Sequence, residues 1–286
     1  MLLTRQLLQT VAEIAQRAGT RIMDVYERPG QPEVVNKSDD SPLTEADLRA
    51  NTLIVAELQT LSPDVPILSE ESVPVPFELR HDWSRFWLVD PLDGTREFLS
   101  RNGEFTVNIA MIENGFPVLG VVHVPVTGIT YLGLHGHDGG AWRVAPDTVW
   151  HPVRCTPLPV RAQWKYHTLR VVASRRHSGD AQDLLLDALS AHFAGIQRLP
   201  MGSSLKICLL AEGLADFYPR LAPTSEWDTA AAHAVLTAAG GNIFDLSLKA
   251  LEYNRKIAML NPSFLATADV SKPWIDVLNE LSHPGK

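Results

Sequence analysis

The sequence has few cysteines and no long apolar run at its start. Its 286 residues include two cysteines, Cys155 and Cys208, which form neither a disulfide framework nor a CxxC metal-binding pair. This usage is typical of a reducing cytoplasm. Charged and polar side chains interrupt the first 27 residues, so we expect neither a signal peptide nor a membrane span there. Internal repeats and low-complexity segments are also absent from the sequence.

Basic residues are outnumbered by acidic ones. The chain has 25 Lys and Arg residues against 33 Asp and Glu residues, a formal net charge of −8. This balance argues against nucleic acid as a partner. It also offers no basic patch for an anionic membrane, although peripheral attachment to the inner face of the cell membrane stays an open alternative to a purely cytoplasmic location. An acidic protein repels a phosphate ligand unless bound divalent cations reverse the local charge.

Hydrophobic residues make up 45% of the chain, enough for a large core in one or two domains. Apolar spacing predicts helices over residues 1–27 and from Thr44 onward. Short strands at 105–112, 118–124 and 129–134 follow, and the short turns between them predict an antiparallel meander. Prolines collect between residues 146 and 159, after which strands alternate with helices. We therefore predict an N-terminal α+β domain over residues 1–155 and a C-terminal α/β domain over residues 156–286.

The most informative stretch is WLVDPLDGTREF, residues 87–98. Its apolar start predicts a short buried strand that ends at Asp90, and Asp93-Gly94 predicts a turn. Thr95 can then cap a short helix. The strand end would present two carboxylates beside free backbone amides, a combination that suits a metal-bound phosphate. The alternative is that both Asp residues only shape a loop.

Three further acids lie at the starts or ends of predicted elements. Asp47 follows Thr44 by three residues, which is the spacing of a capping box. Glu70 follows a short apolar strand and also fits a solvated turn, whereas Asp228 opens a helix and also fits an N-cap. Gly202-Ser203-Ser204 opens another predicted helix, where it either holds an anion or serves as a linker. Functional groups often converge at such element ends.

Together these acids resemble the pattern of the lithium-sensitive, magnesium-dependent inositol monophosphatase superfamily. The matching segments are SEES at 69–72, DPLDGTREF at 90–98 and EWDTAAAHAV at 226–235. KSDDSPLTEAD at 37–47 and MGSSLKICLLAEG at 201–213 extend the resemblance over essentially the whole chain. The resemblance implies a mixed α+β and α/β fold, a layered α-β-α-β-α sandwich.

The closer likeness is to the 3′(2′),5′-bisphosphate nucleotidases of the CysQ type. Arg96-Glu97 is similar to that branch, whereas inositol monophosphatases more often have a DGTxNF turn. Arg220 stands where the inositol enzymes place a Glu, and a fixed cation suits a second phosphate. Ser174 and His177, in ASRRHSG, match the branch's stretch near the nucleotide, although His177 equally fits a solvated loop.

The resemblance implies two or three Mg²⁺ ions per site, with Asp90 shared between two of them. It also implies that Asp47 and Thr95 orient the attacking water. The implied metal ligands are Glu70, Asp90, Leu92 through its carbonyl, Asp93 and Asp228. The implied substrate-binding residues are Glu70, Leu92, Asp93, Gly94, Thr95, Ser174, His177, Ser203, Arg220 and Asp228.

The expected activity is hydrolysis of a small nucleotide, adenosine 3′,5′-bisphosphate, to AMP and phosphate. One alternative is an inositol monophosphatase or a promiscuous sugar phosphatase. Another is a non-catalytic protein that keeps the fold and senses nucleotide or Li⁺. The presence of all five acids and of Thr95 argues against the non-catalytic alternative.

Overall fold

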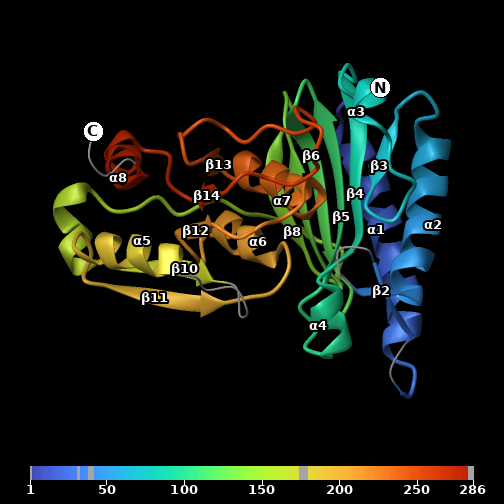
Figure 1. The fold of residues 1–286 in the computed structure, drawn as a ribbon, viewed down its shortest axis with the longest axis horizontal. Helices are drawn as coiled ribbons and strands as arrows, with labels where there is room; N and C mark the ends of the chain where they lie inside the picture. Colours follow the sequence, from blue (N-terminus) through green and yellow to red (C-terminus); the bar gives the residue numbers. More distant parts are fainter. Residues whose placement is uncertain (1, 31–32, 38–41, 174–179, 283–286) are drawn as a thin grey trace.

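The computed structural model describes residues 2–30, 33–37, 42–173 and 180–282. Helices and sheets alternate in five layers along the long axis of the molecule (Figure 1). This arrangement confirms the predicted α-β-α-β-α sandwich. The helices are α1 Arg5–Tyr26, α2 Glu45–Leu61, α3 Phe77–Arg80, α4 Thr95–Leu99, α5 Asp180–Ser190, α6 Leu205–Ala211, α7 Glu226–Ala238, α8 Lys272–Ser282 and the 3₁₀ helix Arg161–Tyr166.

The strands form one large sheet, one smaller sheet and a short hairpin. The hairpin pairs β1 Val34–Asn36 with β2 Pro42–Thr44. The large sheet consists, in spatial order, of β3 Ile67–Ser69, β4 Arg85–Asp93, β5 Thr106–Glu113, β6 Phe116–Val124, β7 Ile129–Leu134, β8 Gly140–Val144 and β9 Trp150–Pro152. The smaller sheet consists of β11 Gly195–Pro200, β10 Thr168–Ala173, β12 Phe217–Arg220, β14 Phe264–Thr267 and β13 Asn242–Asp245.

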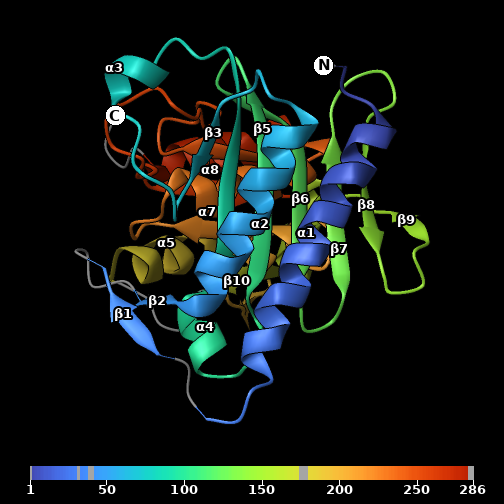
Figure 2. The ribbon, with the colours of Figure 1, turned by 90° about the vertical axis from the view of Figure 1, so that its right-hand side faces the viewer.

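The first two helices cover one face of the large sheet (Figure 2). Thr4 begins α1 by accepting a hydrogen bond from the Leu7 amide, and the apolar side of α1 is fully buried against the sheet. Because β4 is buried on both sides, Trp87 and Val89 contribute to this helix-covered cluster while Phe86 and Leu88 contribute to the opposite one. The antiparallel meander predicted from the turn signals is confirmed in β5 to β8.

The opposite face of the large sheet is covered by α7, which comes from the second half of the chain (Figure 1). Glycines let the helix backbone approach closely. A Cβ on Gly120 would lie 2.1 Å from the Ala231 carbonyl oxygen, and one on Gly133 would lie 2.5 Å from the Val235 Cα. One hydrophobic cluster therefore combines β4–β8 with α6, α7 and the smaller sheet. Residues of both predicted domains, 1–155 and 156–286, contribute to this cluster. The division into these two domains stays a prediction.

Several element boundaries differ from those expected from the sequence. Strand β4 does not end at Asp90 but continues to Asp93 through a β-bulge. The N-cap of α4 is Gly94 rather than Thr95, because Gly94 has a φ of 93° and Thr95 already has helical geometry. Strand β14 was not predicted, and it completes the smaller sheet between β12 and β13. Among the described residues, no helix is both long and apolar enough to cross a membrane.

Candidate active site

The bulge in β4 brings two carboxylates to the same side of the strand. Asp90 pairs with Asn108 and Asp93 pairs with Thr106, so three steps along β4 oppose two along β5. Side chains alternate along a strand, so residues three apart would ordinarily point to opposite faces. The extra residue of the bulge cancels that alternation. Asp90 is 1% exposed and accepts a hydrogen bond from the Leu92 amide at 3.0 Å.

Asp93 joins the two halves of the chain. Its carboxylate accepts a 2.5 Å hydrogen bond from the Ser204 amide, just before α6. Asn108 donates to the same oxygen at 3.4 Å, and the Ser204 hydroxyl donates to the Asn108 side-chain oxygen at 2.9 Å. Thr106 lies 2.8 Å from the Ser204 hydroxyl and supports the same cluster. These bonds fix the Asp93 carboxylate between β5 and the start of α6.

Asp228 and Glu70 approach this cluster from α7 and β3. Asp228 lies in the first turn of α7 and accepts the Ser225 amide at 2.9 Å. The N-cap is Ser225 rather than Asp228, which instead takes part as the third helical residue of a capping box. The Glu70 amide donates to the Val89 carbonyl at 3.1 Å, which holds the residue beside β4. The Glu70 side chain is 24% exposed, and its carboxylate pairs with the Lys37 ammonium at 2.7 Å. Glu71 pairs with the same ammonium at 2.5 Å.

The carboxylates raise one another's pKa. Burial, then repulsion from Glu70, Asp93 and Asp228, raises the pKa of Asp90 well above its usual range. Burial and repulsion from Asp93 do the same for the pKa of Asp228. Burial raises the pKa of Asp93 to about 6, against attraction from Lys206. Buried acids in this state need a cation to remain ionised near neutral pH.

The donor set fits a hard divalent cation, because it consists of carboxylate oxygens and a backbone carbonyl. In the part of the chain that the structure describes, no group of three or more His, Cys, Asp or Glu side chains is already placed so that it could hold a metal ion. The fit therefore rests on the chemistry and mutual repulsion of the buried acids.

Asp47 and Thr95 are in direct contact, as the resemblance implies. The Thr95 hydroxyl donates to the Asp47 carboxylate at 3.2 Å. The other Asp47 oxygen accepts the Thr44 amide at 2.8 Å and the Thr44 hydroxyl at 2.6 Å, completing the predicted capping box of α2. Asp47 is 1% exposed, and burial raises its pKa. The cap and the contact to Thr95 thus use different oxygens of one carboxylate.

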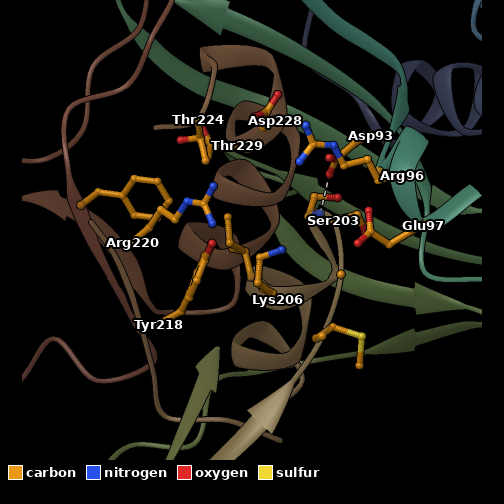
Figure 3. A pocket seen from close by; sticks show the side chains of 16 residues that line it. Asp93, Arg96, Glu97, Ser203, Lys206, Tyr218, Arg220, Thr224, Asp228 and Thr229 are labelled. Carbon is orange, nitrogen blue, oxygen red and sulfur yellow. Dashed lines mark hydrogen bonds between the residues drawn. The ribbon is translucent and has the colours of Figure 1, made fainter. Parts of the chain in front are cut away.

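A pocket of about 160 Å³ opens beside Asp93 and Asp228 (Figure 3). The two acids lie on one side, and the side chains of Lys206, Tyr218 and Arg220 lie across the pocket from them. The pocket is lined by Asp93, Gly94, Arg96, Glu97, Met201, Gly202, Ser203, Ser204, Lys206, Ile207, Tyr218, Arg220, Thr224, Asp228, Thr229 and Phe264. Arg96 and Glu97 lie on the same side as Asp93, so that side carries charges of both signs, whereas the opposite side carries the cations Lys206 and Arg220.

The structure places some predicted substrate residues in this pocket and leaves others undescribed. Gly94, Ser203 and Arg220 line it, and Arg220 donates to the carbonyls of Ala222 at 3.0 Å and Pro223 at 2.8 Å. The predictions for Ser174 and His177 fall outside the described residues.

Sequence reasoning missed Lys206 and Tyr218. Lys206 is partly buried, and loss of hydration lowers its pKa while nearby Asp93 acts to raise it. A signal for Lys206 existed in the segment MGSSLK, where it is the second residue of α6 and follows Ser203 by three positions. Tyr218 carried no signal, because alternation along β12 does not distinguish a pocket from a core.

The chain belongs to the inositol monophosphatase family, which it matches over residues 4–279. Within that family it is similar to proteins named 3′(2′),5′-bisphosphate nucleotidase CysQ, so the resemblance inferred from the sequence is confirmed. The relative from Salmonella typhimurium is 46% identical over 264 residues, covering 91% of this chain and 99% of the relative. The relative from Aggregatibacter actinomycetemcomitans is 37% identical over 279 residues, covering 96% and 97%.

Solved structures give the same placement. CysQ from Bacteroides thetaiotaomicron, described as a bacterial member of the inositol monophosphatase family, superposes with a TM-score of 0.80 at 36% identity, covering 93% of this chain and 98% of that one. The extragenic suppressor protein suhB from Bartonella henselae superposes with a TM-score of 0.75, covering 98% and 100%. At 22% identity, the second likeness supports the fold alone.

Proposed function

We propose that this chain is a Mg²⁺-dependent 3′(2′),5′-bisphosphate nucleotidase that converts adenosine 3′,5′-bisphosphate to AMP and phosphate. The observation that carries the proposal is the two-sided pocket, with buried acids facing a Lys, a Tyr and an Arg across it. The acids suit cation-bound phosphate, and the cations suit a second phosphate. The CysQ-type relatives support the same substrate.

In this proposal the acids hold the metal. The ligands are Glu70, Asp90, the Leu92 carbonyl, Asp93 and Asp228, and the site takes two or three Mg²⁺ ions. Bound Mg²⁺ supplies an activated water and stabilises the charge that builds on the phosphoryl oxygens. The cluster that fixes Asp93 reduces the rearrangement this ligand needs on binding, since its carboxylate already has a set direction.

The pair formed by Thr95 and Asp47 positions the attacking water. Because the Thr95 hydroxyl donates a hydrogen bond to Asp47, its oxygen is free to accept a hydrogen bond from that water. The water oxygen then attacks phosphorus and the bond from phosphorus to the 3′ oxygen breaks. In the balance, one proton of the water ends on the 3′ oxygen of AMP and the other remains on the released hydrogen phosphate. The backbone amides of Gly94 and Thr95 donate to the phosphoryl oxygens.

The remaining phosphate is bound on the cationic side. Arg220 is held by two backbone carbonyls, so its guanidinium is oriented before substrate arrives. Lys206 adds a second cation from α6, and Ser203 adds a hydroxyl at the pocket wall. This side disfavours inositol monophosphate, whose polyol hydroxyls are better matched by an acid than by two cations.

The test is phosphate release from adenosine 3′,5′-bisphosphate and from inositol 1-phosphate, measured side by side with Mg²⁺ and with EDTA. We expect Mg²⁺-dependent release that is much faster from the bisphosphate. Faster release from inositol 1-phosphate would favour the inositol monophosphatase alternative. Tight nucleotide binding without turnover would favour the non-catalytic alternative.

The proposal includes a cytoplasmic location and a small-molecule partner. Cys155 and Cys208 are both free thiols in the structure, in keeping with a reducing compartment.

A further inference from the structure

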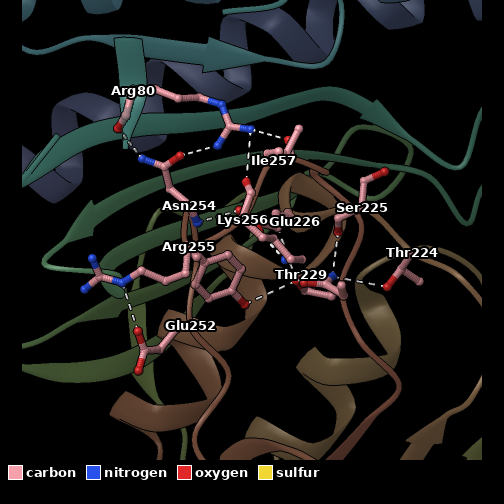
Figure 4. Close-up of polar contacts among 12 residues, drawn as sticks. Arg80, Thr224, Ser225, Glu226, Thr229, Glu252, Asn254, Arg255, Lys256 and Ile257 are labelled. Carbon is pink, nitrogen blue, oxygen red and sulfur yellow. Dashed lines mark hydrogen bonds and ion pairs between the residues drawn. The ribbon is translucent and has the colours of Figure 1, made fainter. Parts of the chain in front are cut away.

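We propose that Glu226 is a positioning residue for the metal ligand Asp228, acting through a buried polar network that ties the start of α7 to the connection between β3 and β4. The inference rests on the proposed function only in taking Asp228 as a metal ligand. The network lies beside the pocket (Figure 4). Glu226, Asn254 and Arg80 do not line the pocket, whereas Thr229, whose hydroxyl donates to the Glu226 carbonyl at 3.2 Å, does.

Glu226 is the first residue of α7 and is completely buried. One carboxylate oxygen accepts the Lys256 ammonium at 2.6 Å, and the other accepts the Asn254 amide at 2.7 Å. The Glu226 amide donates to the Met259 carbonyl at 2.7 Å. The loop between β13 and β14 therefore holds the first residue of the helix by three bonds, two residues before Asp228.

Arg80 connects this loop to the other side of the site. Its guanidinium donates to the side-chain oxygen of Asn254 and to the carbonyl of Ile257 at 2.6 Å, while the Asn254 side-chain amide donates back to the Arg80 carbonyl at 2.6 Å. Arg80 is 2% exposed and ends α3. The connection containing α3 begins at Glu70 and leads into β4 with Asp90 and Asp93.

The network thus links the two segments that provide the predicted metal ligands. A path of direct contacts runs from Arg80 through Asn254 to Glu226, and the same first turn of α7 presents Asp228. An apolar side chain could anchor a helix start without the desolvation cost of a buried charge. A buried carboxylate with directional hydrogen bonds instead fixes the rotation of the helix end and its position along the helix axis. Groups that hydrogen-bond to metal ligands orient those ligands in a similar way.

The test measures Mg²⁺ binding to metal-free protein by calorimetry, without substrate. Glu226→Gln keeps the size of the side chain but removes the charge that pairs with Lys256. We expect the Mg²⁺ affinity of this variant to fall about 10-fold or more, which is the usual effect of losing a residue that orients a metal ligand. The rise in melting temperature caused by Mg²⁺ should shrink with it.

The matched control is Asp216→Asn. Asp216 is 3% exposed and accepts two guanidinium bonds from Arg170, at 2.6 and 3.1 Å, but lies at the opposite end of β12 from Arg220. The Asp216→Asn variant should have a lower free energy of unfolding, because it loses a buried ion pair with Arg170, and should keep the wild-type Mg²⁺ affinity. Wild-type affinity in Glu226→Gln, or an equal loss in Asp216→Asn, would overturn the inference.

Lys256→Gln serves if Glu226→Gln does not fold, because the Lys256 side chain is 38% exposed and its loss leaves a smaller defect. A lowered Mg²⁺ affinity is again expected, and unchanged affinity counts against the inference. A wild-type protein that binds Mg²⁺ but releases no phosphate from the bisphosphate would contradict the proposed function and leave this inference standing.

Discussion

The Thr95 hydroxyl donates a 3.2 Å hydrogen bond to Asp47, whose other oxygen caps α2 through Thr44. If this pair orients water, Thr95→Ala should lower kcat by about 10²- to 10⁴-fold. Mg²⁺ affinity should change far less, because neither side chain is a main ligand. Steady-state kinetics and calorimetric Mg²⁺ titration of the variant measure both quantities.

Thr44→Ala is the matched control for this prediction. It removes the capping hydroxyl bound to Asp47 but leaves the Thr95 contact in place. We expect a loss of about 1 kcal/mol in the free energy of unfolding, with little change in kcat. If Thr95→Ala behaved like this control, the pair would be structural only.

Asp90→Asn should abolish turnover and weaken Mg²⁺ binding. The same variant should raise the melting temperature of the metal-free protein, because burial and the repulsion from Glu70, Asp93 and Asp228 force Asp90 to take up a proton on folding, whereas an amide is already neutral. Melting curves in EDTA and in Mg²⁺ separate the two effects. Near-normal activity at the same Mg²⁺ concentration would show that Asp90 is not a shared ligand.

Arg220→Ala should weaken kcat/KM on adenosine 3′,5′-bisphosphate more than on adenosine 3′-monophosphate. The expected loss is that of a charge-assisted hydrogen bond, about 1.5–3 kcal/mol or roughly 10- to 150-fold. Arg220→Glu should go further and shift preference toward polyol monophosphates. Arg220→Lys controls for charge without the planar fork. Equal losses of kcat/KM on both nucleotides would show that Arg220 does not bind the second phosphate.

Buried histidines should make the protein less stable as pH falls. Burial lowers the pKa of His123 to about 4, and its ring lies 2.9 Å from the Thr130 hydroxyl. Between its ordinary pKa of 6.5 and 4, the unfolded chain binds a proton that the folded chain does not, so stability is lost on acidification. Urea unfolding in EDTA at pH 7 and pH 5 should show a loss that is smaller by about 1–2 kcal/mol in His123→Gln. An equal loss in both proteins would contradict the assignment.

Local signals in the sequence predicted the parts of the fold that local chemistry controls. Thr44 and Asp47 form their capping box with residues three positions apart, so the spacing alone indicated it. The meander of β5 to β8 followed from short apolar segments separated by turn glycines. The acids of the candidate site were predicted from the ends of elements together with the family resemblance, although β4 continues past Asp90 to Asp93.

Features that depend on distant pairing were not predictable in this way. The bulge between Asp90 and Asp93 exists because β4 continues its pairing with β5, and no residue near Asp90 encodes that partner. Strand β14 is four residues long and follows an irregular segment, which leaves too little periodicity to detect. Tyr218 faces a pocket only because α6, α7 and β12 meet there.

Because α7 covers one face of the large sheet, that face cannot be buried by α7 until the ribosome has synthesised this helix. A ribosome has made every strand of that sheet by residue 152, yet the helix that buries its second face ends at residue 238. Through that interval the nascent chain has an exposed apolar face, the state in which aggregation and chaperone binding compete with folding. The helix that ends this exposure also delivers Asp228, so the chain closes its core and completes its set of acids in one event.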